Sequence, residues 1–567
     1  MSKKYEKTLL CMLCLSAAMA NQSVTAEEKD PLSQEIQRLK HQQTINEAEE
    51  NLQRAEKFLD ASQEQTSSPI LDSNAEQNGQ QITQIDIDLN KQTFALNFNP
   101  VIEKYKHQPL SSAVVLNLVK ELTSVLYDAG YVTSAIGLKD KAIENGHLTF
   151  IVHWGMVNDI YVNNEKPSTF KDRAMVSVLP NLKDKVFNVH DIDQFVEILN
   201  TNNKEAEIKV LASDEYAKSN LNIVTQRNSL PTLTLGFNNS GAENNRNGRN
   251  QVTANITWSD VLGTNDTWAF QTGYRFYKQH TKNNQQNYSL SYVQPFSYYT
   301  FETRVSQSDY EKELKGFNTY SSSGKTQTAN IKLSRLLTRN KSSMLFAYSE
   351  FEFKKRQNHV ANRLVGNLHH NKVTVGLSHI SQLWNGKLYS DVSYTNGLNW
   401  FNANKLAYDT KGEKTLRLVS TSLNWHKPVE LFKRNASYQM RIGGQYSSDS
   451  LYSDNQFSIG DEYTVRGFKG SVLSGDKGAY LSQTLTLPFY PQKAYLSTLS
   501  PFIGVDIGRV YQKSPKLNKT LSGIAAGMKA QVKNMSLSFT YAKPLQTLAT
   551  RPNHKSPVYY VNGSITF

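Results

Sequence analysis

The chain has 567 residues and a formal net charge of +13, with 38% hydrophobic residues and many aromatic ones, 29 Tyr and 24 Phe. This composition is poor in aliphatic residues and favours a β-rich protein with little conventional core. The positive charges are spread along the chain and form no basic stripe of the kind that binds nucleic acid.

The first 26 residues predict a signal peptide. A start with three lysines precedes a short apolar run, and small-residue motifs ending at Ala20 and Ala26 offer two alternative cleavage sites. The apolar run is too short to span a bilayer. Both cysteines of the chain, Cys11 and Cys14, lie inside it. We therefore expect a mature chain without disulfides, thiolate chemistry or cysteine-bound metal.

Residues 27–61 are expected to form an amphipathic helix, with Asp30 and Pro31 suited to its N-terminus. Its apolar positions recur at three- and four-residue steps and make a narrow stripe. The other faces carry Gln, Glu, Lys and Arg, which suits a helix lodged in a polar environment; a coiled-coil arm is the alternative. The stretch 62–79 is rich in Ser, Gln and Asn and predicts a flexible linker.

Two α+β modules are predicted next, over 80–155 and 156–227. Each follows the order strand, helix, helix, strand, strand, so the repeat lies in the order of elements and not in residue identity. In the first module, Ser111 or Ser112 caps a helix that ends at Gly130, and strands follow at 131–138 and 148–154. This order resembles POTRA domains, the periplasmic polypeptide-binding modules of the outer-membrane assembly-factor superfamily. Two unrelated small domains are the alternative.

From about Pro231 the helical periodicity stops, and apolar and polar residues alternate to the C-terminus. Segments of about ten alternating residues separated by Asn, Asp and Gly turns are typical of a transmembrane β-barrel. The apolar positions are rich in aromatic residues and the polar positions are small or charged, as in a hydrated lumen. A soluble β-sandwich would instead need a core of Leu, Ile and Val. No long apolar run follows the signal peptide, so helical spanning is excluded.

The region 228–567 is expected to be a barrel of sixteen antiparallel strands, an even number that fits bacterial barrels. The strand near 371 follows the pair His369-His370, which we expect in a loop. The last strand ends on an aromatic residue and resembles the signal by which outer-membrane barrels are handed to their insertion machinery. Its residues on one face are Tyr559, Val561, Ile565 and Phe567. The sixteen strands begin near 231, 250, 267, 286, 299, 327, 343, 371, 386, 416, 435, 478, 499, 521, 535 and 557.

The longest segment between strands, 448–477, contains the run Val465, Arg466, Gly467 and Phe468. The strand after next carries Phe502, Gly504, Asp506 and Gly508 on one face, and the intervening Ile and Val residues point that face into the lumen. A carboxylate between two glycines leaves room for a close partner. A guanidinium binds a carboxylate bidentately, so Arg466 is the expected partner of Asp506. The alternative is an incidental loop arginine.

These two motifs are similar to those of the outer-membrane assembly-factor superfamily. One helix, a linker and only two POTRA-like modules before the barrel resemble TpsB transporters of two-partner secretion, of the haemolysin-activator type. The resemblance covers residues 30–567, and both motifs match without departure. It implies that the loop folds into the lumen, that Arg466 contacts Asp506, and that the N-terminal helix plugs the pore.

The resemblance further implies an outer-membrane pore that captures an unfolded exoprotein in the periplasm and exports it without ATP. The partner would be a large TpsA-type exoprotein such as an adhesin, a haemolysin or a contact-dependent toxin. Capture by adding a strand to a sheet edge needs no side-chain specificity, and 131–138 and 206–211 are candidate edges. Other expected partners are outer-membrane lipid and the insertion machinery. We expect a monomer that binds no nucleic acid, cofactor or metal.

Three other functions are alternatives to export. A barrel-assembly factor of the same superfamily generally carries three or more modules and lacks the leading helix. A passive porin needs no periplasmic modules. An enzyme is disfavoured because the twelve His are scattered and no H-E-x-x-H, G-x-S-x-G or phosphate-binding glycine motif is present.

Overall fold

The structure of the chain is a computed structural model. It describes residues 31–60, 81–144, 146–200, 204–228, 230–241, 250–277, 283–315, 319–340, 342–401, 403, 416–491, 495–513, 516–545 and 556–567. The predicted signal peptide (1–26) and linker (62–79) lie outside the described residues.

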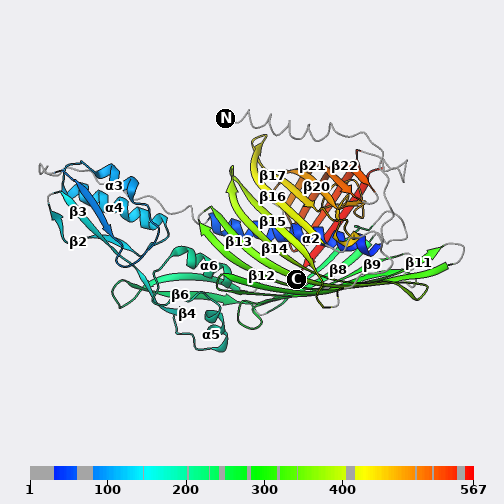
Figure 1. Ribbon diagram of the computed structural model, residues 1–567, viewed down its shortest axis with the longest axis horizontal. Coiled ribbons are helices and arrows are strands. Elements are labelled where there is room, and N and C mark those ends of the chain that lie inside the picture. Colours follow the sequence, from blue (N-terminus) through cyan, green and yellow to red (C-terminus); the bar gives the residue numbers. More distant parts are fainter. Residues whose placement is uncertain are drawn as a thin grey trace.

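Module 1 (81–155) is a three-stranded sheet covered by two helices, at the left of Figure 1. β1 runs parallel to the central strand β3, and β2 pairs antiparallel on the other side of β3, which leaves β2 as an edge. The Ser111 hydroxyl caps α4 by accepting the amide of Val114, as predicted. Its elements are β1 (Gln84–Asp88), α3 (Asn99–Tyr105), α4 (Ser112–Asp128), β2 (Ala135–Glu144) and β3 (His147–His153).

The edge strand of module 1 begins later than predicted, at Ala135 and not at Tyr131. Gly130 has a positive φ of 93° and turns the chain at the end of α4. The ring of Tyr131 then packs 4.9 Å from that of Phe94 and 5.2 Å from that of Trp154, between ring centroids. The aromatic residue therefore belongs to the module core and not to a strand.

Module 2 (156–227) repeats the arrangement with the sheet order β4-β6-β5. β4 is parallel to β6, and β5 is antiparallel to β6 and forms an edge. Its core surrounds Phe195, Leu199 and Leu221, all fully buried. Its elements are β4 (Met156–Val162), α5 (Phe170–Ser177), α6 (Val189–Leu199), β5 (Lys204–Ala212) and β6 (Lys218–Arg227).

The prediction of sixteen antiparallel barrel strands is confirmed. The barrel closes where β24 pairs with β7, with Ile565 opposite Leu235. The strands are β7 (Thr232–Asn238), β8 (Asn250–Ser259), β9 (Thr267–Phe276), β10 (Asn284–Phe296), β11 (Tyr299–Lys315), β12 (Thr319–Asn340), β13 (Ser343–Val360), β14 (Arg363–Leu383), β15 (Gly386–Leu398), β16 (Arg417–Leu431), β17 (Arg434–Tyr446), β20 (Lys477–Thr486), β21 (Leu496–Gln512), β22 (Leu517–Val532), β23 (Met535–Pro544) and β24 (Val558–Thr566).

The alternation along the strands separates an apolar outer face from a polar lumen. On β21, Ile503 is 53% exposed on the outside, whereas Asp506 is fully buried on the inside. The same contrast holds on β23 between Phe539, at 48%, and Thr540, at 7%. Apolar side chains that face outward suit lipid, and closure satisfies the backbone hydrogen bonds.

Several strands are much longer than the nine to eleven or so residues that cross a bilayer. β12 has 22 residues and β14 has 21. In Figure 1, β11 and β12 project far beyond the barrel on the side opposite the modules. The prediction that His369 and His370 lie in a loop is wrong. Both residues belong to the long strand β14 and pair with β13. His370 also has a carboxylate nearby, since Nε2 lies 3.8 Å from Oε1 of Glu352.

Helix α2 (Pro31–Asp60) crosses the inside of the barrel in Figure 1. Among the described residues, no helix is both long and apolar enough to cross a membrane. The predicted 27–61 helix thus agrees with the structure wherever its residues are described, and its surroundings are the lumen.

Candidate functional site in the barrel lumen

The segment between β17 and β20 folds back into the barrel. It contains a short helix, η2 (Ser453–Asn455), and a two-stranded hairpin of β18 (Phe457–Ile459) and β19 (Leu473–Gly475). The tip of the hairpin, 460–472, carries the motif predicted from the sequence. Its apolar core includes Val465, Phe468 and Val510, which are all buried. We call 447–476 the lumen loop.

Arg466 at the tip of the lumen loop is held by Asp506 on β21. The guanidinium donates from Nε to Oδ2 and from Nη2 to Oδ1, both at 2.7 Å, and the Arg466 amide donates to Oδ2 at 2.9 Å. Nη2 also donates to the carbonyl of Gln483 at 3.0 Å. Arg466 is 5% exposed and Asp506 is fully buried, so the pair is a desolvated, bidentate ion pair.

Glycines in the barrel wall allow the loop tip to approach the wall closely, because they have no side chain there. A Cβ on Gly504 would lie 2.2 Å from Nη2 of Arg466, and one on Gly508 would lie 2.9 Å from a methyl of Val465. Gly523 on β22 was not predicted, although a Cβ there would lie 1.9 Å from the Arg466 carbonyl. Gly467, which follows Arg466 in the lumen loop, has a φ of 104° that residues other than glycine rarely adopt.

Two further residues organise the loop tip and were missed in the sequence. Tyr560 on β24 accepts the amide of Gly467 at 3.1 Å and donates to the carbonyl of Phe468. Asp461 accepts the amides of Tyr463 and Thr464, each at 3.0 Å. An Asp whose side chain accepts amides two or three residues further along is a common turn signal, so the sequence could have indicated Asp461. The contact of Tyr560 depends on the closed barrel and has no such local signal.

Helix α2 is bound to the lumen loop through polar contacts. The Gln37 amide donates to the carbonyls of Ser453, Asp454 and Gln456, each at 3.2 Å. Nδ1 of His41 lies 2.9 Å from the Asp461 carboxylate. Burial alone would raise the pKa of Asp461, but His41 and the hydroxyls of Ser471 and Thr464 bring this pKa below its usual value.

The barrel wall holds α2 at two further levels. Glu35 accepts Arg275 of β9 at 2.6 Å, and both are buried. Glu47 accepts Lys332 of β12 at 2.6 Å. Towards the end of α2, an apolar cluster that we call the helix seat packs together, with Tyr298 and Phe346 against it. The seat consists of Ala48, Leu52, Leu336, Met344, Ile380 and Tyr389.

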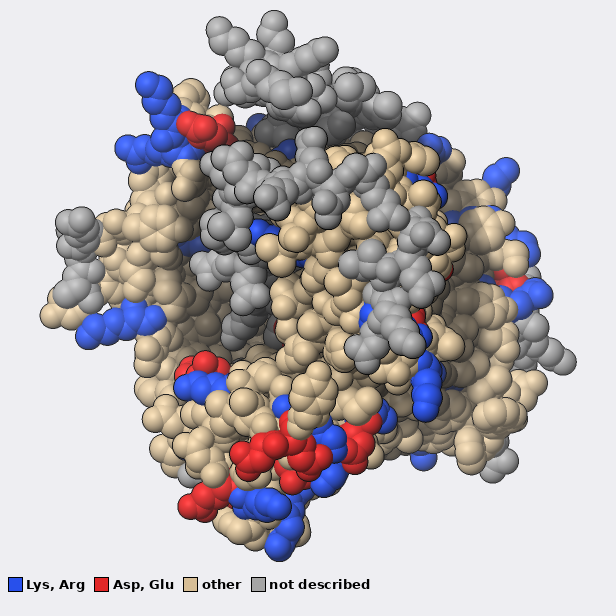
Figure 2. Space-filling model, turned by 90° about the vertical axis from the view of Figure 1, so that its left-hand side faces the viewer, with Lys and Arg blue, Asp and Glu red and all other residues tan. Residues whose placement is uncertain are grey.

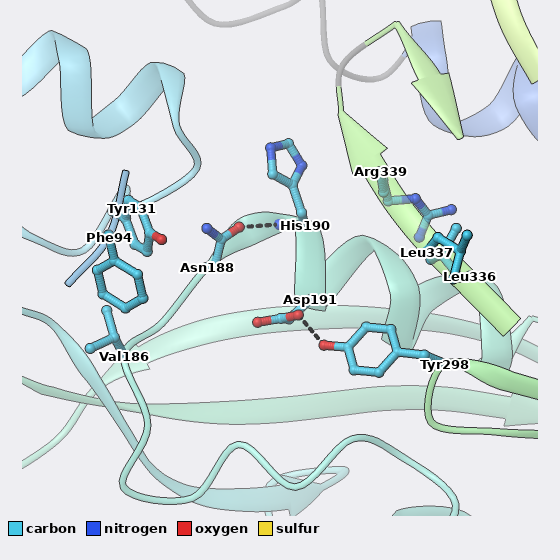
Figure 3. Close-up of a pocket in the computed structure, with 10 residues that line it drawn as sticks. All are labelled: Phe94, Tyr131, Val186, Asn188, His190, Asp191, Tyr298, Leu336, Leu337 and Arg339. Carbon is cyan, nitrogen blue, oxygen red and sulfur yellow. Dashed lines mark hydrogen bonds between the residues drawn. The ribbon is translucent and has the colours of Figure 1, made fainter. Parts of the chain in front are cut away.

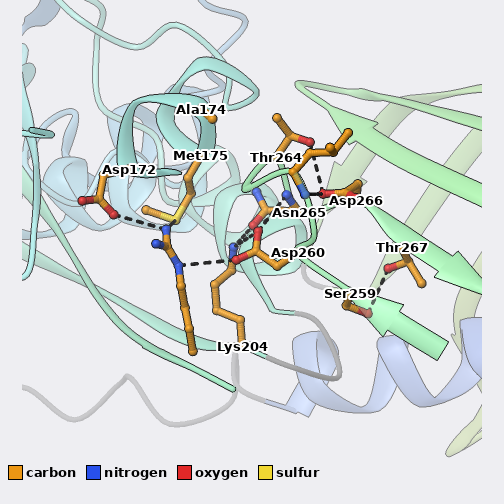
Figure 4. A network of polar contacts seen from close by, with 12 residues as sticks. Asp172, Ala174, Met175, Lys204, Ser259, Asp260, Thr264, Asn265, Asp266 and Thr267 are labelled. Atoms are coloured by element: carbon orange, nitrogen blue, oxygen red, sulfur yellow. Dashed lines mark hydrogen bonds and ion pairs between the residues drawn. The ribbon is translucent and has the colours of Figure 1, made fainter. Parts of the chain in front are cut away.

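Module 2 is joined to the barrel by a buried polar network at the turn between β8 and β9 (Figure 4). Nζ of Lys204 lies 3.2 Å from Oδ1 of Asp260 and also contacts Asn265. Arg227 pairs with Asp260 at 3.4 Å and with Asp172 at 3.2 Å. Burial lowers the pKa of Lys204 to about 8, against the attraction of Asp260.

Figure 2 views the molecule from the side of the modules. On this face acidic and basic side chains are intermixed at the lower end and form no patch of one sign. Mixed pairs of this kind occur in module 2, including Lys183 with Asp159 and Lys218 with Asp184. This face therefore offers no strong charge for recognising a partner.

A closed sixteen-stranded barrel with an inward loop, a lumenal helix and two leading modules defines an outer-membrane transporter with its modules in the periplasm. Residues 217–530 match the family model described as haemolysin secretion/activation protein ShlB/FhaC/HecB, and 81–155 match a ShlB-type POTRA domain. The chain belongs to this haemolysin secretion/activation family, whose members are transporters.

Individual relatives agree with this assignment. The haemolysin transporter protein HpmB of Proteus mirabilis is 26% identical over 445 residues, covering 77% of each chain. The outer membrane transporter CdiB of Escherichia coli is 24% identical over 556 residues, covering 96% of this chain and 91% of CdiB. A solved structure of CdiB from Escherichia coli has the same fold, with a TM-score of 0.82 at 23% identity, and covers 95% of this chain and 100% of that chain.

Proposed function

We propose that this protein exports a large exoprotein across the outer membrane in an unfolded state and without ATP, as the pore of a two-partner secretion system. The observation that carries the proposal is a closed barrel whose lumen is filled by a loop and a helix of the same chain. Polar contacts hold most of the loop and helix in place, and water can replace such contacts when an exported polypeptide passes through the lumen.

The periplasmic modules would capture the exoprotein by strand addition. β2 and β5 are the free edges that lie antiparallel in their sheets, and backbone hydrogen bonds to such an edge are independent of cargo sequence. The intermixed charges on the module side favour this mode over electrostatic recognition. Folding of the cargo outside the cell would then make the passage one-way.

The exported partner would be a TpsA-type adhesin, haemolysin or contact-dependent toxin. One relative is named as a haemolysin transporter, and others carry the name CdiB. The terminal residues Tyr559, Val561, Ile565 and Phe567 would serve the insertion machinery during assembly of the barrel.

The proposal is tested by expressing the chain with the large exoprotein encoded beside it and measuring that exoprotein in the medium. We expect export with the full chain and none with a barrel that lacks residues 81–227. Both barrels should migrate as folded, heat-modifiable bands. If removing the protein instead lowers the amounts of other outer-membrane barrels and leaves export unchanged, the alternative of a barrel-assembly factor holds.

A further inference from the structure

A pocket of about 270 Å³ lies where module 1, module 2 and the barrel rim meet (Figure 3). Module 1 contributes Phe94 and Tyr131, and module 2 contributes Asp191 in the first turn of α6. The barrel contributes Tyr298, in the turn between β10 and β11, and Leu337 near the end of β12. The volume lies at or below the lower end of small-molecule sites, about 300–1,000 Å³, and suits one or two large side chains.

The barrel side of the pocket is shaped by a β-bulge. The register of β12 on β13 shifts between Leu336 and Thr338, which leaves Leu337 without a cross-strand partner. Bulges at barrel rims re-aim side chains and often lie beside functional sites. Leu337 is 45% exposed, although it is a large apolar residue at the periplasmic rim. The bulge thus presents an apolar side chain opposite the aromatic pair of module 1.

Two pocket residues also belong to the surroundings of α2. The Tyr298 hydroxyl donates to Asp191 of module 2, while Tyr298 packs against the helix seat. Leu336 lines the pocket and is itself a member of the seat, beside Ala48 and Leu52 of α2. The amide of Leu336 donates to the Tyr298 carbonyl at 2.8 Å, which links the backbones of the two residues. Tyr298 and Leu336 therefore connect the pocket with the support of the helix.

We propose that this pocket takes an aromatic or branched apolar side chain of the exported polypeptide, and that its filling shifts Tyr298 and Leu336 and loosens the seat of α2. This inference rests on the proposed export function. Tyr131 shortly precedes β2, so a segment added to the free edge of β2 passes the pocket on its way to the pore. Leu336 lines the pocket and also packs in one cluster with Ala48 and Leu52 of the lumenal helix, which makes the pocket the junction between capture and passage.

The binding step is tested with the full chain in lipid nanodiscs and a fluorescein-labelled peptide, Ser-Asn-Thr-Phe-Thr-Asn-Ser, beside its counterpart with Asp in place of Phe. Burial of the ring should make the Phe peptide bind at least about tenfold more tightly. Leu337→Asp should abolish this preference. Trp384→Asp is the matched control, because Trp384 is a 73% exposed apolar residue in the turn between β14 and β15 on the same rim.

Equal binding of the two peptides, or an unchanged preference in folded Leu337→Asp protein, would overturn the proposal. The chain itself offers a rival occupant, since the predicted linker contains Pro69-Ile70-Leu71. Stronger peptide binding after Ile70→Ser with Leu71→Ser would assign the pocket to the linker and would equally overturn it. Heat-modifiable migration of each variant confirms that the barrel is folded.

The coupling step is tested by pore current in planar bilayers. The Phe peptide should raise the frequency of openings of the wild-type pore at least threefold, and should do so neither in Leu337→Asp nor in a chain lacking residues 31–60. An effect that persists without α2 would overturn the coupling. Neither assay measures export, so peptide binding in a protein that exports nothing would contradict the export function alone.

Discussion

The guanidinium of Arg466 and its partner Asp506 are almost completely shielded from water. Asp506 is fully buried between Gly504 and Gly508, and Arg466 is 5% exposed. Breaking a buried ion pair by removing one partner costs about 3–5 kcal/mol, because the other charge stays buried and unpaired. The pair therefore fixes where the loop tip rests in the lumen, more than it adds to the stability of the barrel.

We expect Arg466→Ala to abolish export while barrel insertion stays largely intact, because the sheet hydrogen bonds do not depend on the loop. Export is measured as exoprotein in the medium, and insertion as the heat-modifiable band in outer membranes. Arg509→Ala is the control, since Arg509 is exposed on the same strand as Asp506. Export at wild-type levels by Arg466→Ala would remove the role that we assign to the loop.

Gly504→Ala should reduce export nearly as much as Arg466→Ala, because the new methyl would lie 2.2 Å from Nη2 of Arg466 and displace the guanidinium. Gly366→Ala on β14 is the matched substitution. Its nearest contact would be the Cβ of Asn358 at 3.5 Å, an ordinary van der Waals distance. The same export assay compares the two, and equal export by both variants would show that the docking geometry is unimportant.

At the scale of elements, α2 is a long helix whose environment is mostly polar. Gln37 and His41 hold its first half to the lumen loop, and Glu35 and Glu47 bind the barrel wall. Ala48 and Leu52 of its narrow apolar stripe pack in the small helix seat. A helix held in this way fills the lumen without being part of the folding core.

Removing residues 31–60 should raise the conductance of the pore in planar bilayers while export persists. The physical reason is that the helix occupies lumen volume but forms none of the barrel sheet. Gln37→Ala should give a smaller increase, because it removes the hydrogen bonds to three loop carbonyls. Glu50→Ala, at an exposed position of the same helix, should change nothing. Unchanged conductance after the deletion would mean that α2 is not a plug.

Docking of module 2 on the barrel should strengthen as the pH rises. The docked Lys204 has a pKa of about 8 against an ordinary 10.5, so the undocked state binds more protons between these values and deprotonation favours docking. The gain from pH 7 to pH 9 is about 1 kcal/mol. Hydrogen exchange of the β5 amides, corrected for intrinsic rates, measures it. Lys204→Met should lose the pH dependence, and Lys209→Met, on an exposed part of β5, should keep it.

The elements differ in how well they could be predicted. The alternation of apolar and polar residues predicted the sixteen strands, and a carboxylate between two glycines on one strand face predicted the partner of Arg466. Both patterns involve residues that are close together in the sequence of one strand. Tyr560 could not be assigned in this way. It lies 93 residues from Gly467 and reaches the loop only because β24 closes the barrel against β7. The sequence pattern predicts a loop at His369 because the polar residues of this part of β14 lie beyond the width that lipid requires to be apolar.

At the scale of the whole molecule, the pairing of β24 with β7 closes the barrel, and the backbone of Phe567 takes part in this closure. The Phe567 amide donates to the Leu233 carbonyl at 2.8 Å, and the Leu233 amide donates back at 3.2 Å. The ring itself is 64% exposed and contributes little to the lumen. Closure therefore uses the backbone of Phe567 and does not depend on its side chain, and we propose that this aromatic ring serves as an insertion signal.

Phe567→Ser should lower the amount of inserted barrel several-fold while the inserted fraction keeps its normal melting temperature, because the closing hydrogen bonds remain. Insertion is measured by outer-membrane fractionation, and melting by the temperature of band shift. Phe432→Ser, at an 85% exposed aromatic in the turn between β16 and β17, is the comparison. Normal amounts of the Phe567→Ser barrel would show that the aromatic end is not read during assembly.

The polar contacts of α2 inside the lumen have a consequence for the survival of the cell that carries this pore. Water can replace the hydrogen bonds that Gln37 donates to the loop carbonyls, so on the proposed function the helix would withdraw and reseat without chemical fuel. On the proposed function the channel would be blocked again between rounds of secretion, and the envelope would still keep out detergents and antibiotics.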